Sequence, residues 1–328
     1  MRSLESRSRA LAWLAARIPA GNRSGAFPVE MRAERDAGAA ASDATVFATA
    51  LALPALAAAR DDRAEALVAA GRAFLLRERL AGGLWRFWPR AHPRHGDLPA
   101  DLDDSCCAGA ILAAAGMAKA PAIALLAAQR DAQGRFRTWC VPRREMPLSV
   151  RIALRGMRAF SRPEHPFWSA SEAEPGDVDA GVNANVLWLI GDRPETESAA
   201  RWLVDLVARG AEAGADRWHG RSWSVRYFIA RAAAAGTASL SPAASHLARR
   251  VEGAASQLAT GGRAGGPDEA IDAIEAVGAL DAVDLALAVC VGSRSGADAE
   301  AVRALAARLI ELQAADGSWP SAPLWFGG

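Results

Sequence analysis

Three aspartates stand close together directly before an apolar run of the sequence. Asp101, Asp103 and Asp104 lie in the stretch LPADLDDSCCAGAIL, residues 98–112. Carboxylates at this spacing repel one another, and nearby apolar surface disfavours their charged forms further. A carboxylic acid that keeps its proton near neutral pH can serve as a general acid. The stretch therefore marks a candidate acid–base site.

The same stretch has a purely structural interpretation. It precedes an apparent helix, and aspartate is a preferred N-cap residue because its side chain accepts a backbone N–H. The helix N-terminus also favours the charged carboxylate, which opposes proton retention. In this interpretation Asp103 or Asp104 is the N-cap and the other carboxylates are solvated. The residues alone leave both interpretations open.

Composition excludes several classes of protein. The 328 residues carry 38 basic and 37 acidic side chains, a balance that gives no reason to expect a nucleic acid partner. The four cysteines form no CxxC pattern, which fits a reducing cytoplasm. No apolar run reaches the roughly 18 residues that a membrane span needs. We expect a cytoplasmic protein, with peripheral membrane contact and a homodimer left open.

Helical periodicity runs through nearly the whole chain, and convincing strands are not apparent. The helices come in pairs, of which the first is mostly apolar and the second has one charged face. The apolar members lie at 43–59, 104–118, 181–191, 222–236 and 268–290. The amphipathic members lie at 62–80, 121–131, 195–210, 243–259 and 298–313. Alternating inner and outer helices predict an all-α fold, an α/α toroid of five to six helical hairpins.

The predicted domain organisation is simple. Residues 1–42 are expected to form an N-terminal helix and a linker packed on the barrel, and residues 43–328 a single toroid. The helix near residues 5–18 is a candidate for completing a sixth hairpin. In a ring of this kind all inner helices run the same way, so their N-termini and the polar residues before them gather at one mouth. Apolar walls with a few convergent polar groups are typical of a small-molecule site.

A short motif recurs after the charged helices. Its clearest copy is QAADGSW at 313–319, and related copies are RLAGGLW at 79–85, QRDAQGRF at 129–136 and QLATGGR at 257–263. Glycine ends helices well, so a single copy needs no further explanation. The recurrence of glutamine, glycine and an aromatic residue in order indicates a repeated supersecondary unit.

These two motifs resemble a known group of enzymes. QAADGSW matches the QxxxGxW repeat (the QW motif) of the squalene-hopene and oxidosqualene cyclase family, and DLDDS resembles the DxDD motif of class II terpenoid cyclases. Through the hairpin repeat the resemblance covers most of the chain, at about half the length of a two-domain triterpene cyclase. The resemblance implies an isomerase or lyase of isoprenoid biosynthesis that cyclises a linear isoprenoid by protonation. Asp103 would be the proton donor, with Asp101 and Asp104 holding or tuning it.

Further residues are candidates for binding such a substrate. Aromatic faces would shape the folded chain and stabilise a carbocation through cation–π attraction. The candidates of this kind are Trp85, Trp88, Trp168, Trp188, Trp223 and Phe228. Protonation itself would require no cofactor.

A diphosphate head group would need further ligands. Arg86 and Arg90 could bind its oxygens, with Arg94 and His95 nearby, or could be solvated arginines of a surface loop. Asp179 and Asn183 lie in DVDAGVNANV, residues 177–186, together with Asp177 and Asn185. Their oxygens suit Mg²⁺ bound with a diphosphate, or they hydrogen-bond the mouth of the ring. The sequence does not separate these alternatives.

Other classes of protein stay open as alternatives. Protein prenyltransferases share the toroid and bind zinc, and Asp104, Cys106 and His165 could imitate their ligands. Glycan-active α/α barrels also combine carboxylates with tryptophan platforms. A non-catalytic toroid that binds an isoprenoid or a protein is the third alternative.

Overall fold

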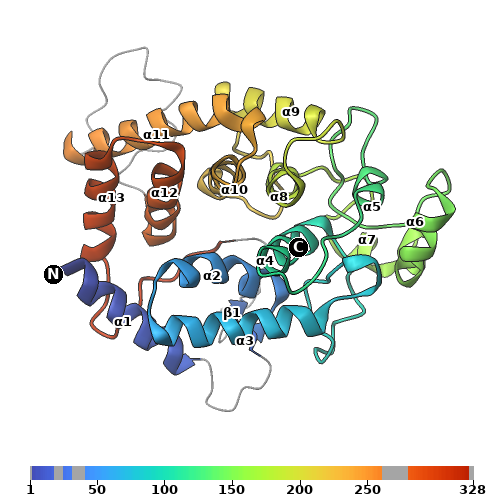
Figure 1. The fold of residues 1–328 in the computed structure, drawn as a ribbon, viewed down its shortest axis with the longest axis horizontal. Coiled ribbons are helices and arrows are strands. Elements are labelled where there is room, and N and C mark those ends of the chain that lie inside the picture. The colour runs from blue at the N-terminus through green and yellow to red at the C-terminus, as the bar shows by residue number, and fades with distance from the viewer. Residues whose placement is uncertain (1, 18–24, 32–40, 261–279, 325–328) are drawn as a thin grey trace. The chain divides into compact units, whose positions relative to one another are not determined.

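The computed structural model describes residues 2–17, 25–31, 41–260 and 280–324, and helices dominate them (Figure 1). Helix α1 (Arg2–Arg17) forms where the N-terminal amphipathic helix was predicted. The expectation of no strands was wrong. Within the described residues β1 (Pro28–Met31) and β2 (Ala41–Ala44) pair antiparallel in one two-stranded sheet. These strands are short and lack an alternating apolar pattern, so backbone pairing rather than side-chain periodicity defines them.

The chain folds into two compact units. The α10 unit comprises Met1–Arg9, Asp131–Phe136 and Val178–Gly327, and the α4 unit comprises Ala10–Arg130 and Arg137–Asp177. Each unit thus collects segments that are distant in the sequence. Among the described residues, no helix combines the length and apolarity that crossing a bilayer would need.

Two rows of helices build most of the α10 unit (Figure 1). In one row α10 (Ser222–Ala234) packs between α8 (Ala180–Ile190) and α12 (Ala282–Ser295). In the other row α11 (Ser241–Thr260) packs between α9 (Glu197–Ala208) and α13 (Ala299–Glu311). Nearly every residue of α8 and α10 is buried, whereas α9, α11 and α13 keep a solvent-facing side. The predicted inner helices are thus observed at α8 and α10, whereas α12 (the third predicted inner helix here) buries only five of its 14 residues.

Aspartates define where two of these helices begin. The Asp281 side chain accepts the N–H groups of Val283 and Asp284, and so caps α12. Asp298 caps α13 in the same way. The predicted helix at 268–290 therefore begins at Ala282 in the described chain, and its residues 268–279 lie outside the described residues.

The α4 unit is built on three longer helices. α2 (Val46–Ala58) packs against both α3 (Asp62–Glu78) and α4 (Leu102–Ala114). The mainly apolar α4 buries most of its residues and α2 buries about half, whereas α3 exposes its charged face. The predicted helix at 121–131 is short, because α5 spans Ile123–Ala127 and is followed by a turn.

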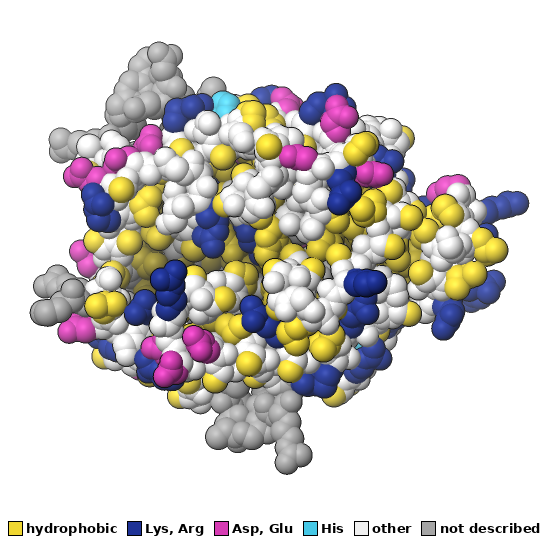
Figure 2. Space-filling view, viewed as in Figure 1, with side chains coloured by type: hydrophobic (Ala, Val, Ile, Leu, Met, Phe, Trp, Pro, Cys, Tyr) yellow, Lys and Arg dark blue, Asp and Glu magenta, His cyan; other side chains and the backbone are white. Residues whose placement is uncertain are grey.

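A run of short elements between residues 137 and 177 was not predicted. It contains α6 (Leu148–Ala153), the 3₁₀ helix η2 (Arg155–Ser161) and α7 (Pro166–Ala170). The side chains of Leu148 and Ile152 are 67% and 52% exposed. Figure 2 shows hydrophobic side chains over this segment, with basic side chains at its margin.

Three copies of the recurring motif share one turn geometry. The backbone N–H groups of Leu80, Asp131 and Ala314 each donate to the carbonyl oxygen four residues later, at 2.8 Å in all three turns. The fourth residue of each turn is a glycine with positive φ, namely Gly83, Gly134 and Gly317. Only glycine adopts such φ values without strain, which explains why this position recurs as glycine. The fourth copy, 257–263, runs beyond residue 260 and so lies partly outside the described residues.

The aromatic residue of this turn has a matching contact in two copies. Trp85 Nε1 donates to the carbonyl oxygen of Leu75 at 2.7 Å, and Trp319 Nε1 donates to that of Leu309 at 2.8 Å. Each indole thus bonds to the residue ten positions earlier, near the end of the preceding helix. The first of these turns contains the short 3₁₀ helix η1 (Ala81–Gly83). In both copies the turn and the indole together anchor the chain to the preceding α-helix.

Candidate active site

The first aspartate of the cluster, Asp101, joins three segments of the α4 unit. Its backbone forms antiparallel bridges to Trp85 and to Trp139. Its side chain is the N-cap of α4, because Oδ1 accepts the Asp104 N–H at 2.7 Å. The predicted structural alternative placed the N-cap at Asp103 or Asp104, and this placement was wrong. Asp101 caps the helix because the extended backbone at this position precedes the first helical residue, Leu102.

Asp104 is the most buried of the three carboxyl groups. Its side chain is inside the unit, with 2% of the residue exposed. Its carboxyl group shares a hydrogen bond with that of Asp101. Its Oδ1 is buried and has no hydrogen-bond partner among the described residues. Such an oxygen is costly to bury as part of a charged group, so burial favours the protonated form.

Both buried carboxyl groups resist ionisation. Burial raises the pKa of Asp101 to about 7, with the charge of Asp103 adding to the effect and hydrogen bonds from Asp104 opposing it. Burial also raises the pKa of Asp104 well above its usual range, and the charges of Asp101 and Asp103 add to this. Desolvation and like-charge repulsion therefore act together, as the spacing of the three residues predicted.

Asp103 has a different environment from its two neighbours. It lies in the first turn of α4 and is partly exposed, whereas Asp101 and Asp104 are buried on either side of it in the sequence. The cluster thus consists of the partly exposed Asp103 and two buried carboxyl groups, Asp101 and Asp104, whose raised pKa values favour their protonated forms. This arrangement suits a proton donor that must meet a substrate.

Neutral groups surround the cluster. The Ser105 hydroxyl accepts the Trp85 N–H at 2.9 Å, which fixes the bridging strand beside α4. Cys106, Cys107 and Cys140 are fully buried. Burial raises the pKa of the Cys106 and Cys140 thiols well above the usual range, so these thiols add apolar surface rather than charge.

The predicted aromatic residues of the α4 unit occupy different positions. Trp85 is adjacent to the cluster through its bridge to Asp101. Trp88 is buried and stacks on His92, with ring centroids 4.1 Å apart. Trp168 is partly buried and lies edge-on to Trp139 at 6.1 Å. Of these candidates, Trp85 contacts the cluster through its backbone, whereas Trp88 and Trp168 contact other aromatic rings.

The two arginines predicted to bind a diphosphate donate to backbone carbonyl groups. Arg90 donates to the carbonyl oxygens of Arg77 and Arg79, where it supports the end of α3. Arg86 donates to the carbonyl oxygens of His95 and Gly156. The binding role predicted for these residues stays a prediction.

The other predicted binding residues belong to the α10 unit. The Arg231 guanidinium lies 3.7 Å from the centre of the Trp188 ring, and that of Arg226 lies 4.7 Å from the centre of the Trp223 ring. Phe228 is buried, and its ring lies edge-on to that of His219 at 4.9 Å. Two of these aromatic faces therefore already contact a cation of the protein.

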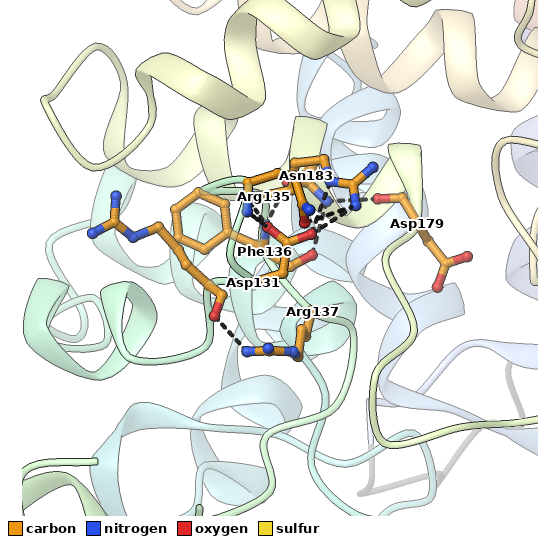
Figure 3. Close-up of polar contacts among 8 residues, drawn as sticks. Asp131, Arg135, Phe136, Arg137, Asp179 and Asn183 are labelled. Carbon is orange, nitrogen blue, oxygen red and sulfur yellow. Dashed lines mark hydrogen bonds and ion pairs between the residues drawn. The ribbon is translucent and has the colours of Figure 1, made fainter. Parts of the chain in front are cut away.

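Asn183 ties the recurring turn at residues 131–136 to α8 (Figure 3). Its Oδ1 accepts the Phe136 N–H at 2.8 Å, and its Nδ2 donates to the carbonyl oxygens of Phe136 and Asp179, both at 2.9 Å. The turn is closed internally by Asp131, whose carboxylate pairs with Arg135 at 2.7 Å. Three hydrogen bonds to backbone groups give Asn183 a structural role in this turn.

The neighbouring polar side chains also have protein partners. Asp179 Oδ1 accepts the Arg217 N–H at 2.9 Å, Asp177 Oδ2 accepts Trp139 Nε1 at 3.1 Å, and Asn185 Oδ1 accepts from Arg231. These contacts favour the interpretation of residues 177–186 as a hydrogen-bonded segment. Within the described residues no three His, Cys, Asp or Glu side chains are grouped to hold a metal ion.

Sequence analysis missed a buried aspartate–histidine pair in the α10 unit. Asp216 Oδ1 lies 3.1 Å from His219 Nδ1, and Asp216 Oδ2 accepts the Gly181 N–H at 2.8 Å. Burial opposes ionisation of Asp216, but the charge of His219 and the hydrogen bonds outweigh it and lower the pKa of Asp216. The spacing of an aspartate and a histidine three residues apart was the available signal. Trp139, which bridges to Asp101, was missed as well.

Comparisons with known proteins were made at three levels. No family model matches the chain, and no curated protein matches it. Among solved structures, it matches the apo form of type II terpene cyclase MstE from Scytonema with a TM-score of 0.64 and 19% identity, over 98% of this chain and 83% of that one. The chain has the fold of a type II terpene cyclase. The predicted all-α toroid and the predicted cyclase-like fold are thereby confirmed.

Two further MstE structures contain ligands. A variant complexed with geranylgeranyl dihydroxybenzoate, described as its substrate, matches with a TM-score of 0.62 and 18% identity, over 98% of this chain and 82% of that one. A second variant, complexed with merosterolic acid A, described as its product, matches with a TM-score of 0.63 and 17% identity, over 98% and 83%. Identity at this level is evidence for the fold.

We predict that stability falls as pH rises through the range set by Asp101. The pKa of Asp101 is 3.8 in the unfolded chain and about 7 in the folded protein. Its contribution to the free energy of unfolding is therefore complete below pH 3.8 and is lost by about pH 7. Asp101→Asn keeps an N-cap oxygen but cannot ionise, so the decline should flatten by up to about 1.4 kcal/mol per pH unit. Urea unfolding across this pH range measures the slope.

The exposed Asp97→Asn variant is the control for this prediction, because Asp97 pairs with Arg94 at the surface. Its stability should follow the wild-type dependence on pH. Identical slopes for the wild type and Asp101→Asn would contradict the assigned environment of Asp101.

Proposed function

We propose that this protein cyclises a linear isoprenoid by protonating it, with Asp103 as the general acid. The observation that carries the proposal is the carboxyl cluster at the start of α4, in a chain with a type II terpene cyclase fold. Asp103 is its accessible member, and Asp101 and Asp104 are buried with raised pKa values. The DLDDS and QAADGSW motifs agree with the same function.

The proposed reaction begins with transfer of one proton. The O–H bond of the Asp103 carboxyl group breaks, a C–H bond forms at an alkene carbon of the substrate, and the adjacent carbon becomes a carbocation. The next alkene supplies its electron pair to that carbon and closes a ring. Loss of a proton from the final cation restores an alkene, so the overall change is an isomerisation. Partial exposure of Asp103 allows it to regain its proton from solvent.

The two buried carboxyl groups would support this step rather than perform it. Asp101 holds α4 in place through its N-cap bond and its backbone bridges. Asp104 shares a hydrogen bond with Asp101, which keeps a proton within the cluster and limits its negative charge. Fewer charges beside Asp103 make it easier to hold the proton that the reaction needs.

The proposed substrate class is an isoprenoid chain, without commitment to a diphosphate head group. MstE, which shares the fold, has been captured with geranylgeranyl dihydroxybenzoate, a substrate with a linear isoprenoid chain. The backbone contacts of Arg90 support α3 and do not favour a diphosphate clamp at that residue. Trp85 is fully buried and its indole bonds to Leu75 of α3, so it supports Asp101 through the backbone rather than presenting an aromatic face to the substrate.

We predict that Asp103→Asn lowers the rate of cyclisation by at least about 100-fold, because the amide cannot donate the initiating proton. The wild type and the variant would be incubated with a panel of linear isoprenoids, and the products analysed by gas chromatography and mass spectrometry. Thermal unfolding of the variant checks that its fold is intact.

Asp97→Asn is the matched control, since Asp97 is an exposed aspartate in the preceding loop. It should cyclise at the wild-type rate. Normal cyclisation by Asp103→Asn would show that the acid is misassigned. A wild-type protein that binds an isoprenoid and returns it unchanged would instead support the non-catalytic alternative.

We also propose that the α6–η2 segment contacts an anionic membrane surface. Leu148 and Ile152 lie one helical turn apart and are the two most exposed large hydrophobic side chains of the α4 unit. The exposed arginines between residues 144 and 164 are Arg144, Arg151, Arg155, Arg158 and Arg162, against two exposed glutamates, Glu145 and Glu164. Exposed apolar side chains flanked by arginines are typical of proteins that bind at a membrane surface. The apolar side chains enter the membrane, and the arginines attract acidic lipids.

Vesicle sedimentation tests this contact. We expect the wild type to sediment with vesicles that contain phosphatidylserine and less with pure phosphatidylcholine, because about 1 kcal/mol is gained per basic residue near an acidic surface. Leu148→Ser combined with Ile152→Ser should reduce sedimentation at least about fivefold. Leu76→Ser combined with Met117→Ser, two exposed hydrophobic residues elsewhere in the unit, is the control. Equal loss in both double variants would contradict the assignment.

A further inference from the structure

We infer that the α4 unit carries a second binding site, for a small amphiphilic anion. A cavity of about 260 Å³ opens beside α6 and η2. Its apolar wall includes Leu80, Leu84 and Met157, and its polar groups are those of Arg86, His95 and Arg155. None of the three aspartates of the candidate active site lines it. The inference is independent of the proposed cyclisation.

Arg86 brings an uncompensated positive charge to this cavity. One of its terminal nitrogens donates to the carbonyl oxygen of His95 at 2.7 Å, but its Nε is buried with no hydrogen-bond partner among the described residues. Burial lowers the pKa of Arg86, which means that its charge is poorly solvated. No acidic side chain lines the cavity to balance it. A bound anion would supply the missing counter-charge.

Two further groups converge on the same space. His95 also lines the cavity, and its Nδ1 donates to the carbonyl oxygen of Trp88 at 2.8 Å. Arg155 is exposed and lines the cavity. Two guanidinium groups therefore border a cavity that no carboxylate lines. Arginines in this grouping suit the oxygens of a carboxylate or a phosphate monoester.

The apolar wall defines the other end of the ligand. Leu80, Leu84 and Met157 give the cavity apolar lining that inorganic phosphate alone would leave without a contact. The cavity, at about 260 Å³, is slightly smaller than the roughly 300–1,000 Å³ of usual ligand pockets, which limits the ligand to a short chain. A short alkyl or prenyl chain bearing one oxyanion fits both features, with its oxygens against Arg86 and its chain against the leucines.

The cavity is separated from the acid cluster by one short piece of backbone. Trp85 bridges to Asp101, and the next residue, Arg86, lines the cavity. The Ala100 N–H contacts the sulfur of Met157, which lines the cavity as well. A ligand bound here would therefore touch the strand that positions Asp101 without touching Asp103.

Isothermal titration calorimetry with hexyl phosphate tests the inference on the full-length protein. We expect saturable one-to-one binding of hexyl phosphate, and binding at least tenfold weaker for inorganic phosphate and for hexanol. Arg155→Gln and Ala153→Phe should each weaken hexyl phosphate binding at least tenfold, the first by removing a charge and the second by filling the cavity. Arg86→Gln should do the same where thermal unfolding shows it to be folded.

Arg94→Gln is the matched control, because Arg94 is an exposed arginine of the same loop that pairs with Asp97 and does not line the cavity. Its affinity for hexyl phosphate should equal that of the wild type. The inference is overturned if the wild type does not bind hexyl phosphate, or if Arg155→Gln and Ala153→Phe bind it as tightly as Arg94→Gln does. Because the assay measures binding without turnover, failure of the proposed cyclisation leaves this result unaffected.

Discussion

The site depends on one conflict, between the charge of three neighbouring carboxyl groups and their burial. Asp101 and Asp104 lie almost entirely inside the α4 unit, where ionised carboxylates are strongly disfavoured. The N-terminus of α4 acts in the opposite direction, because its N–H groups stabilise negative charge. The protein uses one of these N–H groups in the bond from Asp104 to Asp101, and the raised pKa values show that burial outweighs it.

Holding such a cluster requires rigid surroundings, which the chain supplies from distant segments. Trp85 and Trp139 bridge to the backbone of Asp101 from both sides, and the Trp85 indole is anchored in turn on α3. The repeated turn places Trp85 at this position, so the structural motif and the acidic motif serve the same site. The apolar α4 and the buried cysteines complete a neutral setting for Asp103.

Periodicity predicted the parts of this structure that depend on local sequence. Apolar helices such as α8 and α10, and amphipathic ones such as α11, follow directly from the spacing of their hydrophobic residues. The acidic cluster and the turn glycines were also visible, because residue type alone limits what can occupy such positions. Helix α6 was missed because six residues are too few to show a period, and β1 and β2 because their pairing joins residues without a strand pattern.

The contacts that assign roles within the site could not be predicted, since they join residues far apart in the chain. Asn183 bonds to Phe136 across 47 positions, and Trp139 bridges to Asp101 although α4 and α5 lie between them in the sequence. From the sequence the oxygens at 177–186 were as consistent with a metal as with hydrogen bonds. Likewise, the choice of Asp101 as the N-cap depends on where the bridges end and the helix begins.

Infrared spectroscopy of the carboxyl groups tests the central claim most directly. The C=O stretch of a protonated carboxylic acid is resolved from that of a carboxylate, and it can be followed in wild-type protein and in Asp104→Asn near neutral pH. The account predicts a protonated carboxyl band at about pH 7 in the wild type, where an ordinary aspartate is ionised, and its loss or marked weakening in the variant. A wild-type spectrum without that band, or a band unchanged in Asp104→Asn, would contradict it.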